Sequence, residues 1–200
     1  MQEIGAEYSM IVLAGGRSSR MGRDKSDLIY RERTFLDIQI EKGRRLGIGD
    51  ILASGYRGAD CAGRLVMDRF AERGPLGGLE ACLRQAVHSR CLVLSVDTPL
   101  LSVTELQRLL EMDGRNSFPA TILKHGDRLE PLMGVYSVAL ADAMAEALEE
   151  GRGSVLALLK NYGYGVYRSN AEEAQFQNIN EMSEYQELLQ KDDHSHLENQ

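Results

Sequence analysis

Four cationic side chains follow an apolar run and a pair of glycines near the start of the chain. The apolar run covers 10–14, and the glycines are Gly15 and Gly16. The four cations then fall within nine residues: Arg17, Arg20, Arg23 and Lys25. Glycines let backbone N–H groups approach a ligand closely. Arg and Lys side chains form charge-assisted hydrogen bonds with phosphate oxygens. The segment 11–25 therefore predicts a phosphate-binding loop at the end of a strand.

The spacing of this loop excludes two common nucleotide-binding motifs. In the Walker A motif a Gly is followed directly by Lys and Ser or Thr, whereas here Arg23 and Asp24 separate Gly22 from Lys25. The Gly-x-Gly-x-x-Gly dinucleotide motif is also absent from this segment. An ordinary turn with exposed arginines is the alternative, but cations this close together repel one another unless an anion binds.

A single carboxylate follows the most apolar strand candidate. Asp97 comes directly after the run 91–96, which is nearly all apolar. Such a run suits a parallel strand that is covered on both faces, and ligands of parallel sheets bind at the carboxyl ends of the strands. Mg²⁺ is commonly held by one or two carboxylates together with waters and phosphate oxygens. Asp97 is thus the candidate magnesium ligand, and capping of the following turn is the alternative.

Three further segments carry weaker signals. Gly77 and Gly78 at a helix start leave room for a base or a ribose against the backbone, although read alone they fit a plain turn better. Glu130 either accepts hydrogen bonds from a polar ligand or is a solvated loop acid. Of Asn178 and Asn180, one is expected to reach the ligand cleft while the other caps the last helix.

Apolar runs alternate with amphipathic stretches along most of the chain. Ser102 and Glu105 have the spacing of a capping box at a helix start. The alternation predicts an α/β domain with a largely parallel sheet. Strands are expected at 9–13, 50–54, 64–67, 91–96, 120–123, 132–136 and 165–168, and helices at 35–46, 79–87, 102–110, 138–148, 154–159 and from 180.

The bulk properties bound the class of protein. The 200 residues suit one large domain, which we place at 1–190, followed by a polar tail at 191–200. A net charge of −7 argues against a non-specific nucleic-acid binder. We expect no membrane span, no secretory signal and, because no Cys-x-x-Cys pair is present, reduced thiols in a cytoplasmic protein.

Taken together, the motifs resemble those of the molybdenum cofactor guanylyltransferase family. The family carries Leu-Ala-Gly-Gly-x-Ser-x-Arg-Met-Gly-x-Asp-Lys, Gly-Pro-Leu, Asp-x-Pro and a late Asn-x-Asn. These stand here, in the same order, at 13–25, 74–76, 97–99 and 178–180. The resemblance spans about residues 8 to 190 and implies a Rossmann-like nucleotidyltransferase fold with three α/β/α layers. It also implies transfer of GMP from GTP to molybdopterin-bound molybdenum cofactor, with Mg²⁺ as the metal and pyrophosphate as the second product.

The resemblance also implies roles for individual residues. Lys25 matches a phosphate-binding lysine, Asp97 the Mg²⁺ ligand, and Asp68 an acid that contacts the nucleotide. Ser54 falls where some family members have Asn, which puts that nucleotide contact in doubt. The remaining matched positions either begin the nucleotide loop or are tied to turnover or cofactor binding: Leu13, Ala14, Gly15, Gly16, Arg20, Gly22, Gly78 and Asn180.

Other functions remain as alternatives. A cytidylyltransferase acting on the same cofactor has a similar first loop but a Ser-rich segment in place of 74–78, and sugar-phosphate nucleotidyltransferases share part of the loop but are usually longer. A nucleotide-binding module without catalysis would have little need for Lys25, Arg20 and Asp97 together. The expected partners are GTP, molybdopterin and, in transient contacts, cofactor-biosynthesis proteins or recipient molybdoenzymes; neither nucleic acid nor a membrane is among them.

Overall fold

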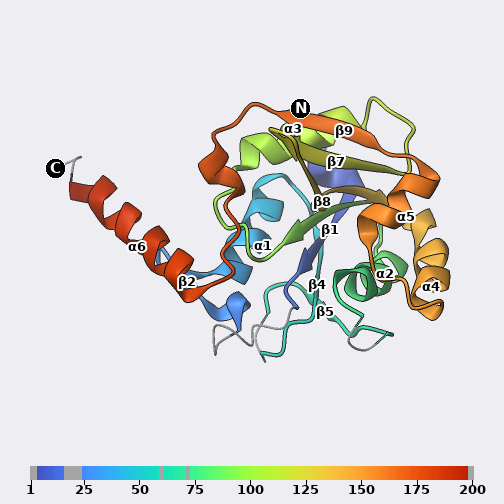
Figure 1. Cartoon of the computed structure of the whole chain (residues 1–200), viewed down its shortest axis with the longest axis horizontal. Helices are drawn as coiled ribbons and strands as arrows, with labels where there is room; N and C mark the ends of the chain where they lie inside the picture. Colours follow the sequence, from blue (N-terminus) through green and yellow to red (C-terminus); the bar gives the residue numbers. More distant parts are fainter. Residues whose placement is uncertain (1–3, 16–23, 59–60, 71–72, 198–200) are drawn as a thin grey trace.

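Alternating apolar strands and amphipathic helices build a seven-stranded sheet that lies between two layers of helices in this computed structural model (Figure 1). The structure describes residues 4–15, 24–58, 61–70 and 73–197. The strands are β1 (Tyr8–Leu13), β2 (Ile29–Tyr30), β3 (Arg33–Thr34), β4 (Asp50–Ser54), β5 (Arg64–Val66), β6 (Arg90–Ser95), β7 (Ala120–His125), β8 (Arg128–Ser137) and β9 (Gly165–Ser169). The α-helices are α1 (Phe35–Arg45), α2 (Pro75–Gln85), α3 (Val103–Asp113), α4 (Ala141–Glu149), α5 (Val155–Tyr162) and α6 (Met182–Leu197), with short 3-10 turns at Ile4–Glu7, Lys25–Asp27 (η3), Val138–Leu140 and Glu173–Phe176.

The large sheet is mostly parallel. Its strand order is β5-β4-β1-β6-β8-β7-β9, with β8 antiparallel to both of its neighbours and the other pairs parallel. β2 and β3 form a separate two-stranded ribbon. The predicted α/β class, with a largely parallel sheet between helical layers, is confirmed.

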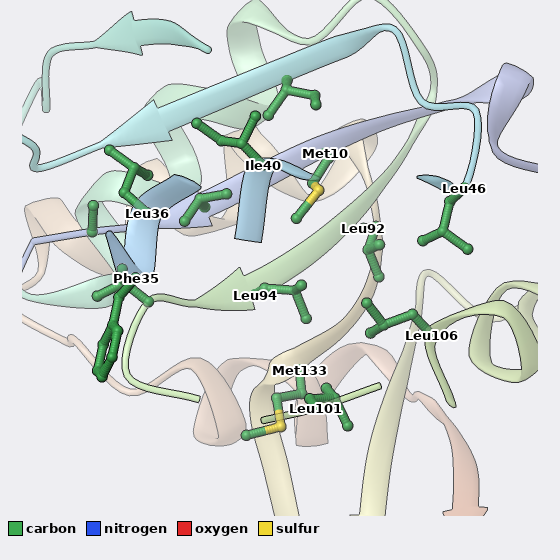
Figure 2. Close-up of a cluster of buried hydrophobic side chains, with 14 of the residues drawn as sticks. Met10, Phe35, Leu36, Ile40, Leu46, Leu92, Leu94, Leu101, Leu106 and Met133 are labelled. Atoms are coloured by element: carbon green, nitrogen blue, oxygen red, sulfur yellow. The ribbon is translucent and has the colours of Figure 1, made fainter. Parts of the chain in front are cut away.

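Two apolar cores hold the layers together, and successive residues of β1 contribute side chains to one core and then to the other. Met10 and Val12 belong to the core under α1 and α3, whereas Ile11 and Leu13 belong to the core under α2, α4 and α5. Side chains in a strand alternate between the two faces of a sheet, so a strand that is covered on both faces is mostly apolar. Figure 2 shows the first core, where Ile40 of α1 lies near Met10.

Local sequence signals set the helix starts. Thr34 caps α1 and Ser102 caps α3, each by accepting a hydrogen bond from a backbone N–H in the first turn. The predicted capping box is only half formed, because Glu105 does not return to Ser102. The Glu105 carboxylate instead accepts hydrogen bonds from Tyr167, at 2.8 Å, and from Ser169 of β9.

Two helices differ from the expectation. The helix at 79–87 is α2, which ends at Gln85, so Val87 is 73% exposed and His88 lies in the loop before β6. α6 runs on to Leu197, through most of the segment expected as a polar tail, and it extends away from the body of the molecule (Figure 1). In the part of the chain that the structure describes, no helix combines the length and the apolar character that crossing a bilayer requires.

Four neighbouring strands end in one row. Leu13 of β1 is in register with Ser54 of β4 and with Ser95 of β6, and Ser54 is in register with Val66 of β5. The segments that follow these strands therefore start side by side at the carboxyl edge of the sheet. This is the edge at which open α/β sheets bind their ligands.

Candidate functional site

Lys25 and Asp97 meet at the carboxyl edge of the sheet, as oppositely charged groups from segments far apart in the chain. The Lys25 ammonium lies 3.7 Å from a carboxylate oxygen of Asp97, and the two side chains are 18% and 20% exposed. Lys25 also donates a 2.6 Å hydrogen bond to the side-chain amide oxygen of Asn180. Three predicted site residues thus come together in one cluster.

The local backbone holds Lys25 in place. Lys25 opens the 3-10 turn η3, which Asp24 caps by accepting a 3.0 Å hydrogen bond from the Ser26 backbone N–H. The Ser26 hydroxyl is fully buried and donates to the Ala14 carbonyl at 3.1 Å. The turn that begins with Lys25 is therefore tied, through Ser26, to the residue that follows β1.

The loop that carries Asp97 is held from two sides. On one side, the backbone N–H of Ile179 donates a 2.8 Å hydrogen bond to the Asp97 carbonyl, which places the segment before α6 against this loop. On the other side, Gln39 of α1 donates to the carbonyls of Ser95, at 2.9 Å, and Thr98, at 3.0 Å. The turn that carries Asp97 is therefore held by hydrogen bonds from two other segments of the chain.

Lys42 is a buried cation behind the same loop. Its ammonium donates to the Pro99 carbonyl at 2.8 Å, to the Gln39 side-chain oxygen at 3.0 Å and to the Thr98 carbonyl at 3.4 Å. The Lys42 residue is only 7% exposed. Burial lowers the pKa of the Lys42 ammonium to about 7, because the charged form loses its hydration.

The first glycine of the loop makes a close backbone contact. The N–H groups of Ala14 and Gly15 both donate to the Ser54 carbonyl, at 2.9 and 3.1 Å. A Cβ added at Gly55, where φ is +80°, would lie 2.3 Å from the Gly15 Cα. Two glycines therefore let the ends of β1 and β4 touch, and the Gly15 N–H is already engaged within the protein.

Ser54, Asp68 and Gly78 form a second predicted cluster at this edge. The Ser54 side chain is 2% exposed and donates a 2.5 Å hydrogen bond to the exposed Asp68 carboxylate. A Cβ on Gly78 would lie 2.3 Å from the Ser54 hydroxyl oxygen. The glycine thus makes room for this hydrogen bond under the first turns of α2.

The loop beyond Asp68 is anchored to α2. Arg69 donates to the Glu80 carboxylate at 2.8 Å, and Arg84 pairs with the same oxygen. Glu80 is fully buried, and among the described residues its second oxygen, Oε2, is the buried side-chain atom that has no hydrogen-bond partner. The spacing of Glu80 and Arg84 predicts an i,i+4 ion pair, and this pair is present. Such a spacing is typical of a solvated helix face and does not show that the acid is buried.

The structure decides between the alternatives for two weaker predictions. Glu130 is not a solvated loop acid: it lies in β8, is 9% exposed and pairs with His125 at 3.0 Å. Of the two asparagines, Asn180 is the one at the site: its side chain accepts from Lys25 and does not cap α6, while the backbone N–H groups of Asn180 and Glu181 donate to Glu184. Gly16, Arg20 and Gly22 lie outside the described residues.

Comparison with known proteins shows the family to which the chain belongs. The family model of the MobA-like NTP transferase domain matches residues 10–164. The chain belongs to the MobA-like NTP transferase family.

A molybdenum cofactor guanylyltransferase of Pseudomonas fluorescens (strain Pf0-1) is 34% identical over 158 residues, which cover 76% of this chain and 79% of that one. A probable molybdenum cofactor guanylyltransferase of Pelotomaculum thermopropionicum is 32% identical, covering 73% and 71%. The predicted family is confirmed, and the protein is a nucleotidyltransferase.

Solved structures agree on the fold of this MobA-like transferase. Molybdopterin-guanine dinucleotide biosynthesis protein A from Archaeoglobus fulgidus superposes with a TM-score of 0.78 at 22% identity, covering 91% of this chain and 97% of that one. CMP:2-keto-3-deoxy-manno-octonic acid synthetase, complexed with CTP, gives a TM-score of 0.76 at 11% identity, covering 94% and 99%. At these identities the likeness concerns the fold alone.

Replacing Gly78 with Ala should destabilise this member of the family. The new Cβ would collide with Ser54 and displace the hydroxyl that binds Asp68. We expect the free energy of unfolding in urea to fall by about 1–2 kcal/mol, because overpacking outweighs the helix propensity gained with Ala. Gly49→Ala is the control, since its Cβ would meet no atom within 4 Å. Equal stability of the two variants would show that the space at Gly78 is not needed.

The burial of Lys42 predicts a pH-dependent stability. The pKa of this lysine is lowered from the usual 10.5 to about 7 in the fold, so between these values the unfolded chain binds more protons. The free energy of unfolding of the wild type, relative to Lys42→Met, should then rise with pH from 7 to 9.5 by up to about 1 kcal/mol per unit. Below pH 7 the destabilisation by the charged lysine is present in full. Parallel denaturation profiles for the two proteins would contradict the shift.

Proposed function

We propose that this enzyme transfers GMP from GTP to molybdopterin-bound molybdenum cofactor and releases pyrophosphate. The observation that carries the proposal is the cluster of Lys25, Asp97 and Asn180 at the carboxyl edge of the sheet. It brings the lysine of the segment 11–25 together with a carboxylate, as a polyphosphate substrate with a metal ion requires. The guanine nucleotide and the acceptor follow from the printed names of the relatives.

The donor set fits a divalent cation that arrives with a nucleotide. Among the described residues no three His, Cys, Asp or Glu side chains come together, so the chain offers no complete protein cage. Asp97 supplies one partly exposed carboxylate. Mg²⁺ is usually held by one or two carboxylates, with substrate phosphates and waters in the other positions. We therefore propose Mg²⁺ as the metal and Asp97 as its ligand; when bound, it would neutralise charge on the phosphates.

The reaction itself needs little acid–base chemistry from the protein. A phosphate monoester has a second pKa near 6, so the terminal phosphate of molybdopterin is largely dianionic at neutral pH. Its oxygen forms a bond to the α-phosphorus of GTP, while the bond from that phosphorus to the bridging oxygen breaks. Pyrophosphate leaves with the electron pair. Of the histidines with described side chains, His88 precedes β6 at the opposite edge and His125 pairs with Glu130.

The barrier is electrostatic, because one anion must attack another. We propose that Lys25 holds the triphosphate and stabilises the charge that grows on the leaving pyrophosphate. Asn180 and Asp97 orient its ammonium at the carboxyl edge of the sheet. Leu13, Ala14, Gly15, Gly16 and Gly22 would line the nucleotide, Arg20 would act beside Lys25, and Ser54, Asp68 and Gly78 would shape the second side of the site.

The wider setting is part of the same proposal. We treat 1–190 as one catalytic domain and place the protein in the cytoplasm, where three unpaired cysteines are stable. Burial raises the pKa of the thiols of Cys82 and Cys91, which keeps both in the unreactive protonated form. Transient contacts with cofactor-biosynthesis proteins or recipient molybdoenzymes stay a prediction.

Removing either charge of the pair should abolish useful turnover without unfolding the protein. We expect Lys25→Ala and Asp97→Ala to lower kcat by about 10²–10³-fold, because each removes an electrostatic contact to the transition state. Both side chains lie at the edge of the sheet and contribute little to the core. Lys160→Ala, which removes an exposed lysine of α5, is the control. Wild-type kcat in either variant would contradict the assigned roles.

Pyrophosphate release separates the candidate activities. With molybdopterin-bound cofactor and Mg²⁺ present, we expect release from GTP to exceed release from CTP and ATP by at least about tenfold, since a site that pairs with one base leaves buried polar groups unpaired with another. Preference for CTP would identify a cytidylyltransferase. Tight GTP binding without release of pyrophosphate would identify a binding module.

A further inference from the structure

We propose that Gln39 and Lys42 are positioning residues that hold the loop 95–99 so that Asp97 meets the metal–nucleotide complex. The inference deepens the proposed function and rests on the role assigned there to Asp97. Both residues lie on α1, and neither belongs to one of the sequence motifs.

The side chains of Gln39 and Lys42 are three residues apart and form one polar pair inside an apolar core. Residues at this spacing are neighbours on a helix face. Gln39 is fully buried, and its amide oxygen accepts a 3.0 Å hydrogen bond from the Lys42 ammonium. Burying an amide and an amine is costly unless both are hydrogen-bonded. The other hydrogen bonds of these two side chains all go to one loop, and they offset the cost of burial.

The loop presents its carbonyl groups to this pair. Gln39 donates to the carbonyls of Ser95, at 2.9 Å, and Thr98, at 3.0 Å, while Lys42 donates to those of Pro99, at 2.8 Å, and Thr98, at 3.4 Å. The carbonyls on both sides of Asp97 are thus fixed from α1. The Asp97 carbonyl itself accepts from Ile179.

Lys42 gathers contacts from two segments at a single atom. Three oxygen acceptors, one from Gln39 and two from the loop, converge on the Lys42 side-chain nitrogen. Removing the donor leaves the Pro99 carbonyl without the one hydrogen bond described for it. The loop would then relax, and Asp97 would lose the position that Lys25 and the metal require.

The test compares Lys42→Met and Gln39→Leu with a control of similar burial. Thr121→Val is the control, because Thr121 is fully buried and donates a hydrogen bond to Asp113 of α3, which pairs with Arg90 at the end of β6 opposite to Ser95. Two measurements are made on the full chain: amide hydrogen exchange of residues 96–101 without nucleotide, and binding of Mn²⁺·GTP. Unfolding in urea verifies that each variant is folded, and Gln39→Leu serves if Lys42→Met does not fold.

We expect exchange in 96–101 to speed up about tenfold in both variants and not in Thr121→Val, because local opening becomes easier there. The affinity for Mn²⁺·GTP should fall about 10- to 100-fold, as for other partners of metal ligands, while affinity for GTP in EDTA changes less than about twofold. Unchanged exchange, or an equal effect of Thr121→Val, overturns the inference. A wild type that binds no Mn²⁺·GTP overturns the proposed function and with it the role assigned to Asp97. Wild-type affinity for Mn²⁺·GTP in both variants, with binding by the wild type intact, overturns the inference alone.

Discussion

The placement of one ammonium group between a carboxylate and an amide is the constraint on which the site depends. Lys25 lies 3.7 Å from Asp97 and 2.6 Å from the Asn180 side chain, so three distant segments must converge on it. An unpaired lysine at a sheet edge would be mobile and fully hydrated. Fixed beside a carboxylate, it presents a directed charge where a polyphosphate can replace water.

The sheet explains how the convergence is achieved. β1, β4, β5 and β6 end in one register row, so the loops that carry Gly15, Asp68 and Asp97 begin next to one another. The chain then returns after β9, and Ile179 binds the Asp97 carbonyl just before Asn180 reaches Lys25. Asn180, from the last sequence motif, thus lies in the same site as Lys25, from the first motif.

Prediction from the sequence succeeds where the signal is local. The run before Asp97 is apolar at nearly every position, and it forms the buried strand β6, with Asp97 just past its end. Glycine pairs likewise mark close approaches, as between Gly15 and Gly55. The family motifs add the order of the site residues, and the fold confirms that three of them meet.

The polar groups behind the site could not be predicted in this way. Gln39 and Lys42 are of residue types that are usually exposed, and no local pattern shows that their polar ends are buried against the Asp97 loop. Glu105 has the spacing of a capping box, yet it binds Tyr167 and Ser169 from a strand 60 residues later in the chain, since tertiary partners outcompete the local one. Each of these contacts depends on how the helices pack on the sheet, which no local pattern records.

The most direct test of the central claim is a crystal structure of the protein with Mg²⁺ and a GTP analogue that resists cleavage between the α- and β-phosphates. We expect the Lys25 ammonium to contact a phosphate oxygen and the Asp97 carboxylate to bind the metal. A triphosphate bound away from the carboxyl ends of β1 and β6, with Lys25 still held only by Asn180 and Asp97, would contradict it.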